Sequence, residues 1–223
     1  MAPRESRGVR LTSVLVIDDH PIVAEGCRRL FKEAGAENVI LARSFVEGLA
    51  FYRSKRPDLI VFELAIEGNV LAGLSFIHRL RVLDKTTPLL ALTVVREPIV
   101  VGQALKQGTT SYLLKDASEE EILKAFNCTR HGRAYLSEKI ATEVLLALVG
   151  RQTDSLQNLT LREYQTLALI SQGKSLGTAA AQLNIGSKTV ANTCTRLKAK
   201  LGVRTFAELM AAGIRLMPPS INA

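Results

Sequence analysis

Three acidic side chains directly follow short apolar runs. Asp18 and Asp19 come after "VLVI", and Glu63 comes after "LIVF". Carboxylates that crowd together repel one another unless a cation joins them. Oxygen ligands suit Mg²⁺, so these three residues could form a magnesium site.

Two further polar side chains end apolar runs of the same kind. Thr93 closes "LLALT", and Lys115 closes "SYLLK". A lysine and a hydroxyl group near the acids could grip a phosphoryl group or a carboxylate. The chemistry that these residue types allow is therefore the binding of a cation, of a phosphoryl group, or of both.

The elements that must position these side chains alternate between strand and helix. Five short runs rich in Val, Ile or Leu recur at residues 13–17, 38–42, 58–62, 89–93 and 111–115. Between them lie segments of helical period, "IVAEGCRRLFKEAG", "SFVEGLAFYRSK", "GLSFIHRLRVL", "IVVGQALKQG" and "SEEEILKAFNCTR". This order predicts an α/β fold with a doubly wound, five-stranded parallel sheet. In such a sheet the functional crevice lies at the carboxyl ends of the strands, where the polar side chains fall.

Helix boundary signals agree with this reading. Pro21 is placed for the first turn of a helix, and Gly35 and Gly108 are placed for helix ends. Ser118 and Glu121 have the spacing of a capping box.

The motifs "VLVIDDHP", "RPDLIVFEL", "LLALT" and "YLLKD" resemble the receiver domain of bacterial two-component response regulators. The resemblance implies a CheY-like receiver over about residues 13–130, with Asp18 and Asp19 as magnesium ligands. It also implies a switch hydroxyl at Thr93, a switch aromatic at Tyr112 and a phosphoryl-gripping cation at Lys115.

Position 63 departs from the receiver pattern. The family has a phosphorylated aspartate there, and this chain has Glu63. The extra methylene adds about 1.5 Å of reach, and misplacement of that order can cost about 100-fold in rate. We therefore expect no acyl-phosphate on Glu63, whose carboxylate could instead imitate the switched-on state by reaching toward Thr93 and Lys115.

The loop after Glu63 departs as well. Glu67 stands where the family usually has proline, and the loop before Gly73 is about two residues longer than the common pattern. Both changes lie at the mouth of the pocket, and Glu67 adds negative charge where a phosphodonor must approach. Two outcomes stay open for magnesium: it binds through Asp18, Asp19 and Glu63, or Glu63 pairs with Lys115 instead.

Charge is unevenly spread over the 223 residues. The formal net charge is +8, and from residue 157 onward eight Lys and Arg stand against two acids. The C-terminal end therefore favours a polyanionic partner, although a solvated surface is the plainer alternative. No stretch has the length and composition of a membrane span or a secretory signal, and the three scattered cysteines fit a reducing cytoplasm.

Four regions are expected along the chain: a flexible basic tail at 1–12, the receiver at 13–130, a linker with a helix at 131–156, and a helical domain at 157–223. In the linker, Ser137 can cap a helix that places four apolar side chains on one face, namely Ile140, Val144, Leu145 and Leu148. The polar stretch "GRQTDSLQN" follows, as expected of a linker.

The C-terminal region predicts an all-α domain of four helices. Thr160 and Glu163 form a capping box before the first helix, which ends at Gly173. A short alanine-rich helix, "SLGTAAAQLNIG", ends at a glycine, and the next helix starts with Ser187 as its N-cap. The tight turn around "NIGS" joins these two helices into a helix-turn-helix, whose second helix would enter the major groove.

The segment "LTLREYQTLALISQGKSLGTAAAQLNIGSKTVANTCTRLKAKLGV" resembles the LuxR-type DNA-binding domain, and both halves together resemble NarL/FixJ-class regulators. By position, the resemblance implies phosphate contacts from Lys188, Thr189, Arg196 and Lys200. It implies base-facing side chains at Val190, Ala191, Asn192 and Thr195. Family members often have lysine at 191 and usually histidine at 193, so Ala191 and Thr193 make this surface poorer in charge.

The leading hypothesis is a cytoplasmic transcription regulator, not an enzyme, that binds double-stranded DNA as a homodimer. A sensor kinase or another regulatory protein is a possible partner. The first alternative is an interaction module that sequesters a kinase or another regulator, with weak DNA binding. The second is a magnesium-dependent phosphohydrolase, for which a nucleophilic aspartate and a water-activating base are lacking beside Glu63.

Overall fold

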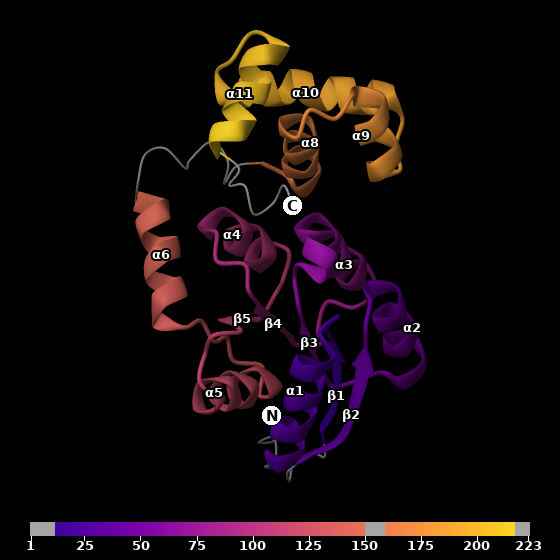
Figure 1. Cartoon of the computed structure of the whole chain (residues 1–223), viewed down its shortest axis with the longest axis vertical. Coiled ribbons are helices and arrows are strands. Elements are labelled where there is room, and N and C mark those ends of the chain that lie inside the picture. Colours follow the sequence, from indigo (N-terminus) through magenta and orange to yellow (C-terminus); the bar gives the residue numbers. More distant parts are fainter. Residues whose placement is uncertain (1–11, 150–158, 217–223) are drawn as a thin grey trace, which may run out of the picture.

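The computed structural model describes residues 12–149 and 159–216 (Figure 1). The tail before residue 12, the polar linker stretch at 150–158 and the end of the chain after residue 216 lie outside the described residues.

The N-terminal half is a five-stranded parallel sheet in the order β2-β1-β3-β4-β5, as the sequence predicted. Its strands are β1 (Thr12–Ile17), β2 (Ala36–Ala42), β3 (Leu59–Phe62), β4 (Leu89–Thr93) and β5 (Ser111–Leu114). Its helices are α1 (Pro21–Glu33), α2 (Phe45–Lys55), α3 (Val70–Leu83), α4 (Pro98–Lys106) and α5 (Glu119–Arg130), with a 3₁₀ turn η1 (Ile66–Gly68) before α3.

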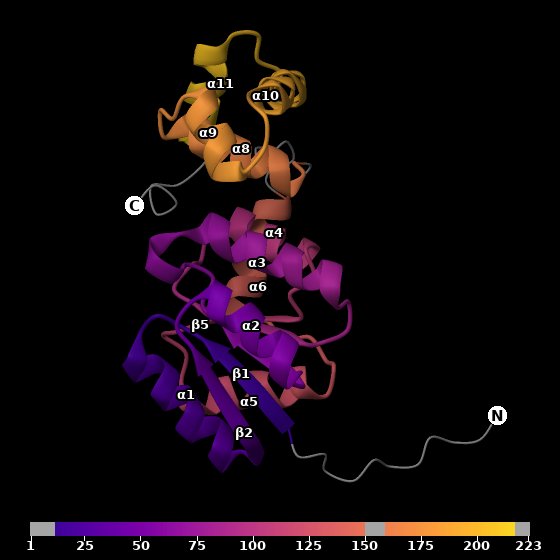
Figure 2. The same cartoon turned by 90° about the vertical axis from the view of Figure 1, so that its right-hand side faces the viewer.

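The sheet divides the apolar side chains into two cores. Val14 and Val16 pack with α1 and α5, whereas Leu15 and Ile17 pack with α2, α3 and α4 on the other face. This split follows from the two-residue period of a strand that is buried on both sides. The layered arrangement is visible in Figure 2.

Several boundary signals act as the sequence predicted. Gly35 and Gly108 follow helices with φ values of +90° and +104°, a region that glycine enters without strain. The Ser118 side chain caps α5 by accepting a hydrogen bond from Glu121 N. The predicted capping box is only half formed, because the Glu121 carboxylate accepts the hydroxyl of Tyr135.

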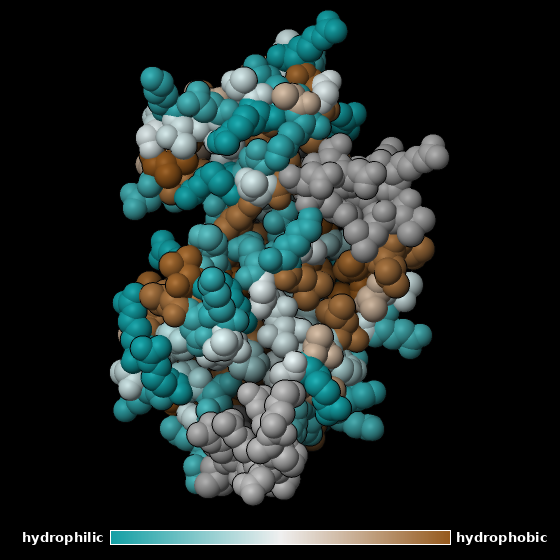
Figure 3. All heavy atoms as spheres, turned by 180° about the vertical axis from the view of Figure 1, so that it is seen from behind, coloured by the Kyte–Doolittle hydropathy of each residue, from teal (hydrophilic) through white to brown (hydrophobic). Residues whose placement is uncertain are grey.

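After α5 the chain returns along the edge of the sheet. Tyr112 N donates to Tyr135 O at 2.9 Å, and α6 (Glu138–Val149) then packs against α4. Ile140 is fully buried, but Leu145 is 60 % exposed, so it does not share the inward face predicted for it. The Leu148 side chain lies outside the described residues. Figure 3 shows the resulting apolar surface around α6.

The C-terminal half contains α8 (Leu161–Ser171), α9 (Leu176–Leu183), α10 (Ser187–Leu201) and α11 (Phe206–Leu216). The capping box of Thr160 and Glu163 is present in both directions. Two predicted caps are wrong. Asn184, with a left-handed φ of +52°, ends α9 in place of a glycine, and Gly186 precedes α10, so Ser187 is already its first residue.

Among the residues that the structure describes, none of the helices has the length and apolar character needed to cross a bilayer. The three cysteines are free thiols, and Cys27 and Cys194 are buried. Burial raises the pKa of the Cys27 thiol to about 12, so this thiol stays protonated and unreactive.

Gly73 should tolerate no side chain, because a Cβ atom there would lie 2.0 Å from the backbone oxygen of Leu64. We expect Gly73→Ala to lower the free energy of unfolding by about 1–3 kcal/mol in urea titration. Gly102→Ala in α4 is the matched control, since its Cβ would meet no atom within 4 Å. Equal stability of the two variants would contradict the close approach of α3 to Leu64.

Candidate functional site: an acidic pocket and a helical reading face

The acidic pocket forms where four adjacent strands end. Asp18 follows β1, Glu63 follows β3, Thr93 ends β4 and Lys115 follows β5. Because parallel strands end at one edge of the sheet, residues up to 97 positions apart meet there.

Lys115 joins two buried carboxylates. Its Nζ lies 2.6 Å from Asp18 Oδ2 and 2.9 Å from Glu63 Oε2, and these acids are only 4 % and 2 % exposed. Burial acts to lower the pKa of Lys115, but the hydrogen bonds and charges of the two carboxylates outweigh it and raise the pKa. The lysine therefore stays charged and offsets the repulsion between the acids.

The other oxygen of Glu63 contacts Thr93, the residue predicted to be the switch hydroxyl. Glu63 Oε1 accepts hydrogen bonds from the Thr93 hydroxyl and from Ala65 N, the latter at 2.8 Å. Thr93 Oγ1 in turn accepts Val95 N at 3.2 Å. The hydroxyl of Tyr112, which is fully buried, donates to Val95 O at 2.8 Å. Glu63 is thus linked to Tyr112 through the loop after β4.

Asp19 is held by the loop after β3. Glu67 N donates to Asp19 Oδ2 at 2.9 Å, and His20 Nδ1 lies 2.9 Å from Asp19 Oδ1. Burial acts to raise the pKa of Asp19, but these contacts together lower it. Glu67 has a left-handed φ of +52°, a conformation uncommon for a residue with a Cβ atom.

The donor set agrees only in part with the predicted magnesium ligands. Ligand atoms of Asp18, Asp19 and His20 lie within 4.8 Å of one another, but Glu63 is not in this group among the described residues. Oxygens of all three acids already contact Lys115, Thr93 or backbone N–H groups. A cation at Asp18 and Asp19 would have to compete with Lys115, which already contacts both Asp18 and Glu63.

The second half presents α10 as a polar face. Lys188, Thr189, Asn192, Thr195 and Arg196 are exposed, and Ala191 is half-buried. The opposite side of α10 packs on α8 and α9, so one ridge of short polar and basic side chains faces outward. This geometry is that of a helix-turn-helix with an open second helix.

Comparisons with known proteins match both halves. Residues 14–127 match the response regulator receiver domain, and residues 157–212 match the bacterial regulatory proteins of the luxR family. The methanol utilization control regulatory protein MoxX of Paracoccus denitrificans is 37 % identical over 211 residues, which cover 95 % of each chain. The probable transcriptional regulatory protein NarL of Mycobacterium tuberculosis is 30 % identical, over 91 % of this chain and 93 % of that protein.

The chain belongs to the response regulator family. RcsB from Salmonella enterica, solved bound to the promoter rprA with a phosphomimetic, has a TM-score of 0.67 and 19 % identity. The match covers 90 % of this chain and 97 % of that one, and it supports the shared fold. The luxR-type domain makes this response regulator a two-part protein, with the acidic pocket in one part and the helix-turn-helix in the other.

Two residues of the predicted reading face have another place in this response regulator. Val190 is fully buried, so it packs inside the helical domain and does not face the bases as the resemblance implied. Lys200 Nζ donates to Glu163 Oε2 at 2.7 Å and so joins α10 to α8. In this structure Lys200 therefore stabilises the helical domain, and its ammonium group is already engaged by Glu163.

Sequence reasoning missed the backbone groups of the pocket. The N–H groups of Ala65, Glu67 and Val95 each bind a side chain of the site. The pattern of side chains does not indicate which backbone N–H groups will bind the site, because every non-proline residue carries one. The length predicted for the loop after Glu63 drew attention to this loop, which supplies the N–H groups of Ala65 and Glu67, but not to Val95.

The tie between Glu163 and Lys200 should make the response regulator's helical domain sensitive to acid. Burial acts to raise the pKa of Glu163, but hydrogen bonds from Lys200 and Thr160 outweigh it and lower the pKa from 4.5. Stability from this ionised group is therefore present above pH 4.5 and lost as pH falls through the lowered pKa.

Glu163→Gln should lower the unfolding temperature at pH 7, as followed by circular dichroism. Below pH 4.5 the unfolding temperatures of the variant and of the natural chain should become similar. Glu138→Gln, an exposed acid in the first turn of α6, is the control. A stability difference that stays constant from pH 7 to pH 3 would contradict this assignment.

Proposed function

We propose that this response regulator binds DNA to control transcription and that Glu63 replaces regulation by aspartyl phosphorylation. The observation that carries the proposal is the position of the Glu63 carboxylate, which accepts the Thr93 hydroxyl on one oxygen and contacts Lys115 with the other. These are the two groups that the receiver resemblance assigns to a phosphoryl group.

The length of Glu63 explains how it reaches both partners. Its backbone N–H stays in the sheet, bonded to Ile17 O at 2.9 Å, while its longer side chain carries the negative charge to Thr93. An aspartate would end about one methylene, or ~1.5 Å, earlier. Glu63 therefore supplies a permanent charge where a phosphorylated aspartate would carry its own.

Lys115 supplies the positive charge that this arrangement needs. It neutralises Asp18 and Glu63 together, so the carboxylates do not depend on Mg²⁺ to lie close. In a pocket that holds a cation at Asp18 and Asp19, this cation would attract a phosphodonor. Two features of the loop act against such attraction here. The Glu67 backbone covers Asp19 from the loop side, and its carboxylate adds charge that repels a phosphate.

DNA is the polyanion that fits the other half. The exposed side of α10 carries Lys188 and Arg196 beside Asn192 and Thr195, which combines phosphate-binding and base-reading types. RcsB, which shares the fold, is described as two dimers bound to two parallel DNAs, with 20 % identity and a TM-score of 0.60. We propose the same partner class and a homodimer for this chain.

The two alternatives have less support. The relatives are named as regulatory proteins, which does not favour a phosphohydrolase. A module that only sequesters a kinase would have no need of an open α10, whose polar ridge is exposed along its length.

Phosphodonors should leave the natural chain unchanged. We expect no added mass and no change in oligomeric state after incubation with acetyl phosphate or beryllofluoride and Mg²⁺. Glu63→Asp should regain a response, because its shorter carboxylate leaves room for the phosphoryl group. A stoichiometric adduct on the natural chain that Glu63→Gln abolishes would refute the proposal.

Removing the charge of Glu63 should weaken DNA binding. We expect Glu63→Gln to lower affinity about tenfold in gel-shift titration, a coupling typical of two linked sites. Glu37→Gln, an exposed acid on β2, is the control and should bind like the natural chain. Unchanged affinity of Glu63→Gln would mean that the carboxylate has no regulatory role.

Lys188 should contribute a phosphate contact. Lys188→Ala should weaken binding to all duplexes and reduce the slope of log affinity against log salt by about one. Lys139→Ala, an exposed lysine on α6, removes the same charge far from α10. If both variants changed the slope equally, the effect would come from net charge and not from α10.

A further inference from the structure

Helix α8 is buried on every side. All of its residues from Glu163 to Ser171 are buried, including the polar Gln165 and Thr166. The other helices of the C-terminal domain cover only part of it. Residues of α3 and α4 of the receiver contact it from the other side. Helix α8 lies between the receiver and α10 in both views (Figures 1 and 2).

Two directed hydrogen bonds cross between the halves. Gln165 Nε2 donates to Ser75 Oγ on α3 at 2.8 Å, and Gln103 Nε2 on α4 donates to Leu159 O at 3.1 Å. Gln103 and Gln165 are 3 % and 4 % exposed. A buried amide that lost its partner would cost free energy, so each bond specifies one docked position.

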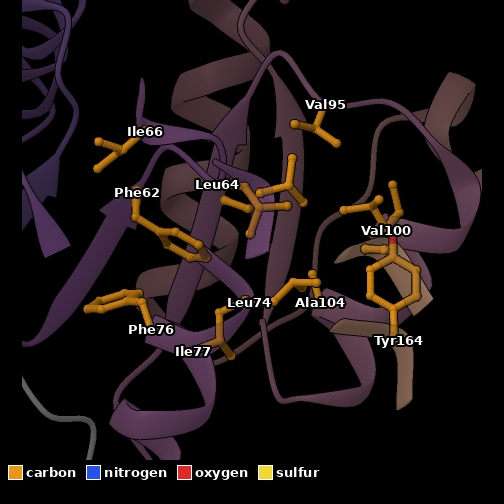
Figure 4. Packing of buried hydrophobic residues seen from close by; sticks show 14 of the residues in the cluster. Phe62, Leu64, Ile66, Leu74, Phe76, Ile77, Val95, Val100, Ala104 and Tyr164 are labelled. Atoms are coloured by element: carbon orange, nitrogen blue, oxygen red, sulfur yellow. The ribbon is translucent and has the colours of Figure 1, made fainter. Parts of the chain in front are cut away.

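Tyr164 is the apolar anchor of this contact. It is fully buried and belongs to the same hydrophobic cluster as Val100, Val101 and Ala104 of α4. Figure 4 shows its ring beside Val100. Its hydroxyl has no hydrogen-bond partner in the described part of the chain, so the ring acts through packing.

Tyr164 lies close to Tyr112, the last residue in the series of contacts that starts at Glu63. The pKa of Tyr164 is raised by burial and then by the charge of Glu97, which also raises the pKa of Tyr112. Tyr112 is in turn bonded to the loop that Thr93 and Glu63 hold. Two tyrosines from the two halves therefore share one environment at the start of α4.

The docked pose leaves the reading face of α10 open. The exposed residues Lys188, Asn192 and Arg196 lie on the far side of α10 from α8. The receiver covers α8 and none of these three side chains. A duplex could therefore reach α10 without separation of the halves.

We propose that the α3–α4 surface of the receiver is a docking surface for α8 of the same chain, and that docking favours DNA binding instead of blocking it. The proposal rests on the proposed function, since it names how the receiver acts on the DNA-binding half. By fixing α10 relative to the receiver, docking fixes the separation of the two reading helices in a dimer. When one reading helix is bound to its half-site, the second helix then has a higher effective concentration at a half-site of the matching spacing.

The test uses the full chain with Gln103→Ala and Gln165→Ala combined, so that one change lies on each side of the contact. Small-angle X-ray scattering should show a larger maximum dimension than for the natural chain. Affinity for a paired-site duplex, selected by the natural chain from a random-sequence pool, should fall about tenfold. Affinity for unrelated duplex DNA should stay the same.

Tyr164→Phe is the matched control and should keep both the compact shape and the affinity, because it removes only the unpartnered hydroxyl. Tyr164→Ala should expand the chain like the glutamine pair, and the glutamine pair decides the question if this variant does not fold. Tighter DNA binding by the expanded variants would show a blocking contact and overturn the proposal. Expansion without any change in affinity, or no expansion, would overturn it as well.

Failure of the proposed function gives a different result. If the natural chain selected no duplex from the pool, the DNA-binding assignment would be wrong. The scattering comparison would still decide whether α8 docks on α3 and α4.

Discussion

One lysine between two buried carboxylates holds the carboxyl edge of the sheet together. Lys115, which follows β5, forms ion pairs with Asp18, which follows β1, and with Glu63, which follows β3. Two nearly inaccessible negative charges would otherwise repel one another in a poorly hydrated site, and a buried charge that loses its partner is costly. The positions of Thr93 and of the following loop depend on this pairing, because Glu63 holds Thr93.

From that edge, a sequence of short contacts leads to the other half of the molecule. Glu63 holds Thr93, Thr93 holds Val95, and Tyr112 is bonded to the same residue. Next to them α4 carries the apolar surface on which Tyr164 packs. A change in the charge or length of one side chain at position 63 thus has a physical route to α8.

The sheet and its helices could be predicted because strand and helix periods are local properties of the chain. The meeting of Asp18, Glu63, Thr93 and Lys115 followed from the general rule for parallel sheets. The pairing of Glu63 with Lys115 was one of two open outcomes, since the choice depends on charges from three strands. Leu145 and Val190 were misplaced because a helical period does not say which face another element covers.

The contact between the two halves could not be predicted for a related reason. Gln103 and Gln165 look like surface residues in sequence, and each is buried against a partner far away along the chain, 56 positions for Gln103 and 90 for Gln165. The caps at Asn184 and Gly186 differ from expectation because Asn also adopts a left-handed conformation and a helix can start at a glycine.

A helix that packs against two domains must keep side chains that fit both of them. Most surface helices have one side on which substitutions are nearly neutral, and that freedom lets sequences drift. Helix α8 has no such side between Glu163 and Ser171, because part of its surface packs in the helical domain and part contacts the receiver. Sequence change in α8 is therefore constrained from two directions, and the two domains of this chain are expected to evolve as a coupled pair and to resist exchange with the domains of other regulators.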